Sequence, residues 1–253
     1  MITSPMRLGM RQFRIIHSLV LILIPSLCLS ANPDTLFGAI RFDHDTVSPA
    51  LQAFAVLTVL SLAPSILIML SSFTRIVIVL SMLRSALGLQ QTPPNTVIIS
   101  LALFLTLFTM MPVVKTIHDT AYIPYQTKQI SSELALEKAA APLRQFMLKQ
   151  THEKDLKLIW QLAKEPIPSR AEDIQFYQLI PAFLLSELQT AFQIGFMIFL
   201  PFLLVDLIVS GILMTMGMMM MPPMTISLPI KLLLFVLIDG FDLVVQALVT
   251  SFK

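Results

Sequence analysis

Four long apolar segments, arranged as two pairs, dominate this sequence. The first pair covers 50–88 and 96–114, and the second covers 180–215 and 226–251. Helices are the natural structure for them, because in hydrocarbon each backbone polar group must be satisfied within its segment. The alternating pattern of outer-membrane strands is not found. With 56% hydrophobic and only 13% charged residues, the sequence predicts an all-α integral membrane protein.

Each pair of apolar segments contains a turn rich in helix-breaking residues. Gln-Gln-Thr-Pro-Pro-Asn at 90–95 separates the first pair, and Met-Pro-Pro at 221–223 separates the second. The sequence therefore predicts two apolar helical hairpins, one at 50–118 and one at 176–253.

The first arm of each hairpin is too long for a simple membrane span. As one helix, 51–88 would extend ~57 Å, whereas the hydrocarbon core is ~30 Å thick. Proline removes a helical hydrogen bond, so Pro64 and Pro201 are expected to kink the two long arms. Long kinked hairpins of this kind are expected to bury themselves in an assembly.

The first thirty residues have the organisation of a cleavable signal peptide. Three arginines precede an apolar run at 15–29, and Cys28 and Ser30 place small residues at the −3 and −1 positions of a cleavage site. We expect removal of 1–30, with an uncleaved signal anchor as the alternative. Cys28 is the only cysteine, which excludes an intramolecular disulfide and a multi-cysteine metal site.

Two polar stretches complete the chain. A short one at 31–49 follows the leader, and a longer one at 119–175 is predicted to form a small helical domain. With a cleaved leader both are extracytoplasmic, and the turn that carries Arg75 and Arg84, without a neighbouring acid, faces the cytoplasm. The second turn has no charge, but this topology places it on the cytoplasmic side as well.

Ionisable side chains inside the apolar segments are the next signal, because a charge at membrane depth costs several kcal/mol. The candidates are Arg75, Arg84, Glu187, Asp206, Lys231, Asp239 and Asp242. Glu187 and Lys231 are the most suggestive pair, but within one hairpin they would be ~30 Å or more apart. Their salt bridge would have to join neighbouring subunits or require a folded-back arm. The alternative is that each charge lies at the interface and reaches water.

Catalytic motifs are not apparent. Asp239 and Asp242 could form a cation site, a proton relay or a protease dyad, but the Gly-x-Gly-Asp element of such a protease is missing, and polar contact between helices is favoured. No hydrolase, zinc or nucleotide motif is found. The net charge of +2, without basic and aromatic clusters, argues against nucleic acid. We predict neither enzymatic activity nor a cofactor or bound metal.

Seven of the sixteen methionines fall between 214 and 224. They are Met214, Met216, Met218, Met219, Met220, Met221 and Met224. Methionine is flexible and polarizable, so this cluster could form a deformable apolar seal. A small-ion or copper transporter is an alternative, because Met214 and Met218 share a helical face and thioethers bind Cu(I). An ordinary apolar helix end is the third interpretation.

The most distinctive stretches of the sequence are 72–81, 83–88, 101–106, 180–188, 216–223 and 237–241. They closely resemble the FliP family, the P subunits of the flagellar type III secretion export gate. The resemblance extends over 51–252, and the predicted leader is typical of the flagellar branch. One departure is Phe241, where the family is expected to have tryptophan.

The resemblance implies a pseudo-helical pore in the bacterial inner membrane, at the flagellar basal body. Its partners would be further copies of the chain, the Q, R and B subunits, and the unfolded flagellar proteins that leave through the pore. The segment 214–224 would close the pore, with Met218, Met219 and Met220 projecting into it. Glu187 and Lys231 match an ion pair between subunits.

Overall fold

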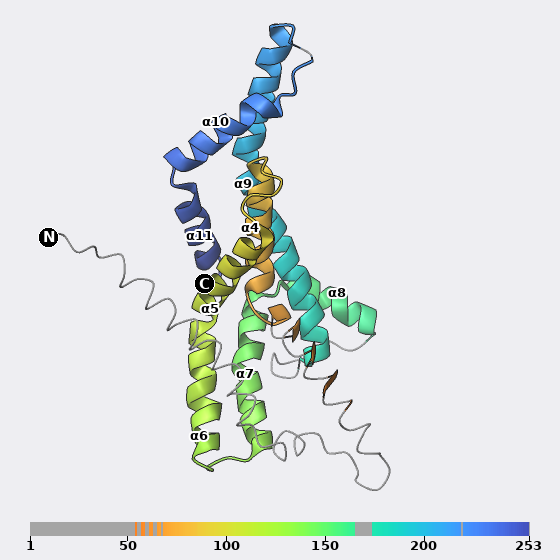
Figure 1. The fold of residues 1–253 in the computed structure, drawn as a ribbon. Helices are drawn as coiled ribbons and strands as arrows, with labels where there is room; N and C mark the ends of the chain where they lie inside the picture. The colour runs from red at the N-terminus through yellow and green to blue at the C-terminus, as the bar shows by residue number, and fades with distance from the viewer. Residues whose placement is uncertain are drawn as a thin grey trace, which may run out of the picture. The chain divides into compact units, whose positions relative to one another are not determined.

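The computed structural model describes residues 54, 57–58, 61–62, 65–66, 68–164, 174–218 and 220–252. The predicted signal peptide, the polar segment 31–49 and Pro64 lie outside these residues. The chain divides into two units, Met1–Ser61 and Leu62–Lys253, and the description below concerns the second. Every regular element among the described residues is a helix (Figure 1), which confirms the predicted fold class.

The second unit contains the helices that carry the site. They are α4 (Phe73–Ala86), α5 (Asn95–Ile117), the π-helix η1 (His118–Tyr122), α6 (Ile123–Gln126), α7 (Ser132–Gln150), α8 (Glu153–Ala163), α9 (Phe176–Thr215), α10 (Met224–Leu237) and α11 (Gly240–Thr250).

Helix α4 is shorter than the sequence predicts. A break at 70–72 precedes it, so the first arm, for which the sequence predicts a kink at Pro64, is interrupted at 70–72. The chain turns away from the end of α4 at Gly88, whose φ of 78° is a left-handed conformation suited to glycine. The amide of Gly88 donates to the Ser85 carbonyl and that of Leu89 to the Arg84 carbonyl, so the last turn is closed by its own backbone.

Two helical runs are long and apolar enough to cross a membrane. One is Asn95–Gln126, in which α5 continues through η1 into α6, and the other is α9. The predicted boundary at 118–119 falls inside the first run. Helix α9 continues through both Pro181 and Pro201 for 40 residues. Helices of this length and hydropathy are typical of a membrane protein.

The second arm of the carboxyl-terminal hairpin is bent, whereas the sequence analysis treats 226–251 as one arm. Helices α10 and α11 meet at 66° and together count as a third candidate span. At the bend, Asp239 has a φ of 50°. A Cβ atom on Gly240 would lie 2.2 Å from ring carbons of Phe235, so glycine permits the close approach of α10 at this corner.

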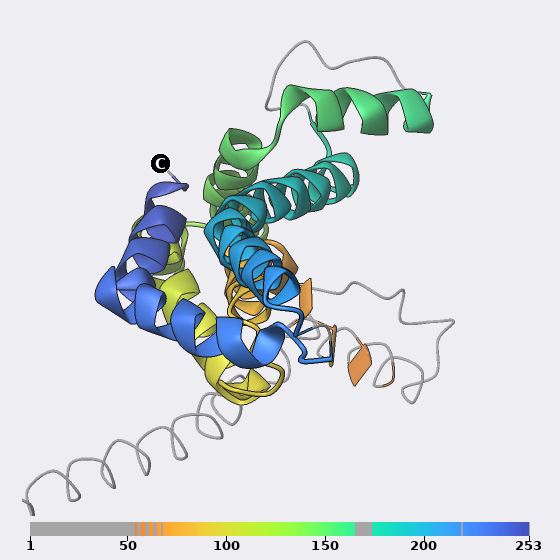
Figure 2. The ribbon, with the colours of Figure 1, turned by 90° about the horizontal axis from the view of Figure 1, so that it is seen from above.

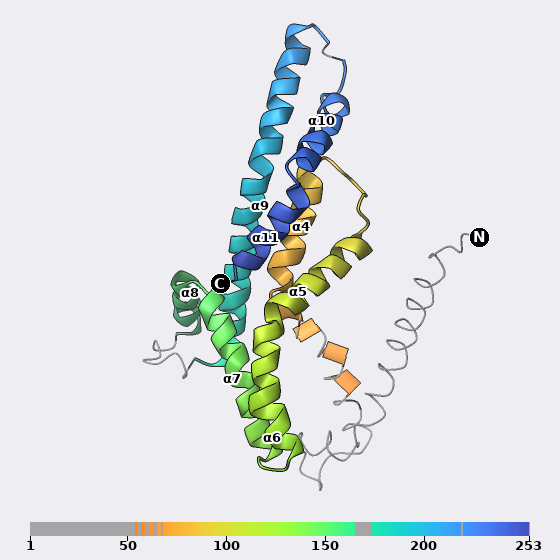
Figure 3. The ribbon, with the colours of Figure 1, turned by 90° about the vertical axis from the view of Figure 1, so that its left-hand side faces the viewer.

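Helix α4 lies between α9 and α5 (Figure 3). The main apolar core is built on it, from buried residues of α4, α5, α9, α10 and α11: Ile76, Val79, Leu80, Leu83, Ala102, Ala191, Phe202, Phe235, Val244 and Leu248. Figure 2 shows α8 beside the first part of α9, where Trp160 and Phe183 belong to a second cluster. The carboxyl-terminal hairpin is thus anchored on α4.

Candidate functional site: the methionine segment and the buried charges below it

The methionine segment, residues 214–224, joins the end of α9 to the start of α10. Helix α9 ends through Gly217, which has a φ of 73°, and the Met218 amide donates to the Leu213 carbonyl at 3.0 Å. Pro222 and Pro223 then precede α10, which begins at Met224. Proline is common at the start of a helix because its fixed φ suits the helix and its missing N–H group would have no partner there. A glycine stop and a proline start therefore define the segment as a short connection between two helices.

The methionine side chains of this segment are exposed in the isolated chain. Met220 is fully exposed and Met214 is 67% exposed, whereas Met218 is the least exposed of those described, at 38%. Met219 lies outside the described residues. Exposed apolar surface of this density is typical of an interaction site, and thioether side chains can adapt to different partners.

One lysine links the two helices below the segment. The ammonium group of Lys231, on α10, donates to Oδ2 of Asp206 on α9 at 2.6 Å. It also donates to the carbonyl of Ala86, the last residue of α4, at 3.2 Å. The Lys231 side chain is 6% exposed and that of Asp206 is 35% exposed. A single buried cation therefore connects α4, α9 and α10.

A second buried cation, Arg75, lies near the start of α4. Its Nε donates to Oε2 of Glu187 at 2.9 Å, and its Nη2 donates to Oε1 of the same carboxylate. Nη2 also donates to Gln150 Oε1 at 3.1 Å, and Nη1 donates to the Ser251 carbonyl at 2.9 Å and hydroxyl at 3.0 Å. The ring of Phe252 lies 4.0 Å from the guanidinium carbon.

The contacts of Arg75 use all five N–H groups of the guanidinium. Its partners come from α7, α9 and the residues just after α11, so one side chain joins four helices. The bidentate geometry with Glu187 is the strong form of a charged hydrogen bond. A buried pair with every donor satisfied is strongly destabilised when one member is removed.

Known proteins with similar sequences identify the family of this chain. The sequence model of the FliP family matches residues 56–248. The chain belongs to the FliP family. The flagellar biosynthetic protein FliP of Pectobacterium carotovorum subsp. carotovorum is 52% identical over 203 residues, which are 80% of this chain and 79% of that protein. The protein of that name from Bacillus subtilis (strain 168) is 51% identical over 210 residues, or 83% and 95% of the two chains.

The match confirms the resemblance drawn from the sequence. The flagellar biosynthetic protein FliP of Aquifex aeolicus (strain VF5) is 50% identical over 199 residues, 78% of this chain and 83% of that protein. The family match includes Arg75, Glu187, Asp206, Lys231 and the methionine segment, while Ser251 and Phe252 lie just beyond it.

In this FliP-family chain, Glu187 and Lys231 each have a partner other than the one predicted. Glu187 binds Arg75 and Lys231 binds Asp206. From Glu187 to Asp206, α9 rises roughly 28 Å, which agrees with the separation expected from the sequence. A Glu187–Lys231 contact between subunits stays a prediction, because it concerns two copies of the chain.

Of the two arginines predicted for the turn of the first hairpin, Arg84 lies beside the turn and Arg75 lies in a buried ion pair. Arg75 is 2% exposed and paired with Glu187, so it is not an unpaired charge of the turn, while the cytoplasmic orientation of the turn stays a prediction. Arg84 donates to Asn95 Oδ1 at 2.6 Å and to the Pro93 carbonyl at 3.2 Å. It therefore ties the end of α4 to the start of α5.

Asp239 and Asp242 lie at the bend rather than in a buried site. Both side chains are exposed. The Asp239 carbonyl accepts from the Asp242 amide at 3.0 Å, which is a backbone contact at the start of α11. Among the described residues no group of three or more His, Cys, Asp or Glu could hold a metal ion.

Sequence reasoning missed the polar contacts that attach α8 to α9. The Ser186 hydroxyl accepts from the His152 amide at 3.0 Å and donates to Asp155 Oδ2 at 2.6 Å. Ser186 directly precedes Glu187, and both are fully buried. The only sequence signal is that two adjacent polar residues interrupt an apolar run. Gln150 and Ser251 gave no signal, because they meet Arg75 from 75 and 176 positions away.

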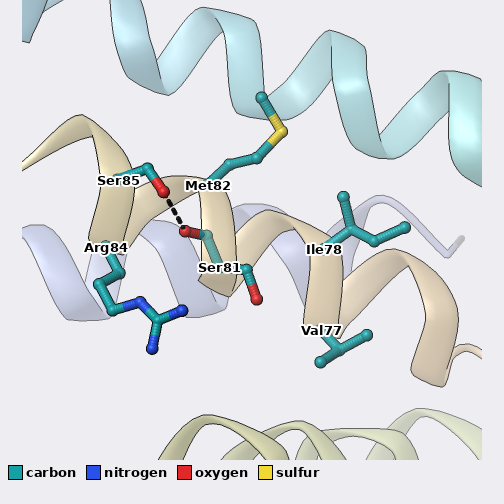
Figure 4. A pocket seen from close by; sticks show the side chains of 6 residues that line it. All are labelled: Val77, Ile78, Ser81, Met82, Arg84 and Ser85. Atoms are coloured by element: carbon teal, nitrogen blue, oxygen red, sulfur yellow. Dashed lines mark hydrogen bonds between the residues drawn. The ribbon is translucent and has the colours of Figure 1, made fainter. Parts of the chain in front are cut away.

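A shallow groove of about 240 Å³ lies along α4. It is lined by Val77, Ile78, Ser81, Met82, Arg84 and Ser85 (Figure 4). Met82 extends toward α9, where a Cβ atom on Gly195 would lie 2.3 Å from the Met82 sulfur. The Ser85 hydroxyl donates to the Ser81 carbonyl. The lining therefore serves helix packing and offers no acid and base pair for catalysis.

Proposed function

We propose that this chain is a pore-forming structural subunit of the flagellar protein export gate, and that its methionine segment seals the closed pore. The relatives are named flagellar biosynthetic proteins, which supports a role in flagellar assembly. The observation that carries the proposal is the exposure of the methionines between the ends of α9 and α10. Copies of such a segment around one axis would form a ring of flexible apolar side chains.

Extensive apolar exposure supports assembly. Only 17% of the apolar window of α9 is buried within the chain, and large side chains along it are exposed, among them Phe192, Phe196, Met197, Leu204 and Leu207. Lipid or further protein must cover such a surface. The proposed partners are further copies of the chain, the Q, R and B subunits of the gate, and membrane lipid, in a pseudo-helical complex.

The proposed cargo is the unfolded flagellar protein that passes through the pore. The complex would lie in the bacterial inner membrane at the flagellar basal body, with the methionine segment on the cytoplasmic side. Energy for export would come from partners, so the proposal gives this chain no catalytic step, cofactor or metal.

The test compares ion conductance and flagellar secretion in cells that carry the chain with its Q and R partners. Deletion of 218–220 is expected to produce an ion leak, because it removes three methionines from the seal. The matched control deletes 127–129, an exposed turn between α6 and α7, and should not leak. If the 218–220 deletion variant assembles and shows no ion leak, the proposal is contradicted. Loss of copper uptake in that variant would favour the alternative, a copper transporter.

A further inference from the structure

In the part of the chain that the structure describes, one side-chain ion pair joins the arms on either side of the methionine segment. Asp206 precedes the end of α9 by nine residues, or roughly 14 Å, and Lys231 follows the start of α10 by seven residues, or roughly 10 Å. Their contact at 2.6 Å therefore fixes the distance between the two arms at nearly the same depth below the segment.

The end of α4 supports this contact from a third side. The Ala86 carbonyl accepts from Lys231 and belongs to the last turn of α4, where helix carbonyls lack internal partners and a cation is favoured. Two residues after Ala86, a Cβ atom added to Gly88 would lie 3.8 Å from Met224 and 3.9 Å from Leu228. The turn just after α4 therefore lies close to the last residue of the methionine segment.

Asp206 depends on Lys231 for its side-chain pairing. Its Oδ2 binds the ammonium group, while Oδ1 is buried and has no hydrogen-bond partner among the described residues. Without the cation, neither oxygen would have a protein partner and Oδ1 would remain buried and unpaired, which is costly. The arms would then separate to hydrate the carboxylate.

We propose that Lys231 is the positioning residue of the methionine segment, which it holds against the end of α4 through Asp206 and the Ala86 carbonyl. The proposal rests on the proposed function in one respect, that the methionine segment is the gate. It adds that the position of the gate is set by a polar contact within each subunit, about two helical turns below the methionines. Loss of the contact is expected to make the segment mobile without unfolding α4 or α9.

The test measures the position of the segment directly, by electron paramagnetic resonance between spin labels. Labels are placed at Gln90→Cys, in the exposed turn after α4, and Met220→Cys, in the segment, with Cys28→Ser as the background. The full chain is studied in lipid nanodiscs. The intact contact should give one narrow distance distribution.

Lys231→Met and Asp206→Asn are each expected to lose the main peak of this distribution, and Lys231→Arg should retain it. The matched control is Lys115→Met, which removes an exposed lysine from the last turn of α5 and should leave the distribution unchanged. If Lys231→Met fails to fold, Asp206→Asn decides, because Asp206 is partly exposed.

An unchanged narrow distribution in folded Asp206→Asn would overturn the proposal. This result is independent of the export test, since it is obtained without partners or cargo. A mobile segment in a variant that neither leaks nor secretes abnormally would support the positioning role and count against the gate.

Discussion

The guanidinium of Arg75 and the carboxylate of Glu187 form a bidentate pair that joins α4 to α9 across 112 positions of the chain. Both side chains are almost completely buried. Glu187→Gln is expected to lower the free energy of unfolding by ~3–5 kcal/mol, because it leaves a buried guanidinium without its counter-charge. Thermal or denaturant unfolding of the purified chain in detergent measures this loss.

The control for this variant is Glu153→Gln. Glu153 is 90% exposed and lies 3.7 Å from Lys157, and surface pairs of this kind contribute only ~0–1 kcal/mol. Equal losses in the two variants would show that Arg75 finds other compensation, such as Gln150.

The predicted pairing of Glu187 with Lys231 concerns the assembled complex, and double-mutant cycles separate it from the pairing within the chain. We expect Arg75 and Glu187 to be coupled by ~0.5–3 kcal/mol in the isolated chain, as residues in direct contact are. Coupling between Glu187 and Lys231 should appear only in the complex. Glu187→Ala and Lys231→Ala should both lower recovery of the complex, measured by co-purification with the Q and R subunits. Recovery at the normal level in both variants would remove the assembly role.

The elements of this fold follow from local sequence, whereas the charge pairs do not. Apolar length and the breakers at 90–95 and 221–223 are local signals, and the chain leaves its helices at both places. The partners of Arg75 come from 75, 112 and 176 positions away, so no spacing rule reaches them. Parallel packing of α4 on α9 brings Arg75 beside Glu187 and Met82 beside Gly195. The pair of Lys231 and Asp206 forms where α10 packs on α9.

The bend between α10 and α11 has a signal in the sequence at Asp239 and Gly240. Asp239 and Gly240 interrupt an apolar run, and residues of these types adopt left-handed turns readily. The sequence analysis treats Asp239 together with Asp242, as a candidate pair of intramembrane carboxylates or as polar contact between helices, whereas the structure places Asp239 and Gly240 at a corner. The break before α4 had a weaker signal in Ser71 and Ser72, because serine is tolerated inside apolar helices.

Gly240→Ala tests the corner. The new methyl group would lie 2.2 Å from the Phe235 ring, and overpacking of this kind costs ~1–3 kcal/mol of unfolding free energy. Phe235→Leu in the same chain should recover part of the loss, because it removes the clashing ring edge. Gly211→Ala is the control, since a Cβ there meets nothing within 4 Å and alanine favours a helix by up to ~1 kcal/mol. A neutral Gly240→Ala would mean that α10 can move away from α11 at little cost.

The proposed seal predicts different results for apolar and polar replacements of the methionines. Leucine keeps the apolar surface of Met218, Met220 and Met221 but has fewer side-chain torsions, so a triple leucine variant should hold ions while it secretes more slowly. A triple glutamine variant has similar length and flexibility but attracts water, and it should leak while it still secretes. Conductance and secretion are measured in the same cells, with complex recovery as the control for assembly. A leucine variant that leaks as much as the glutamine variant would show that apolar surface alone does not close the pore.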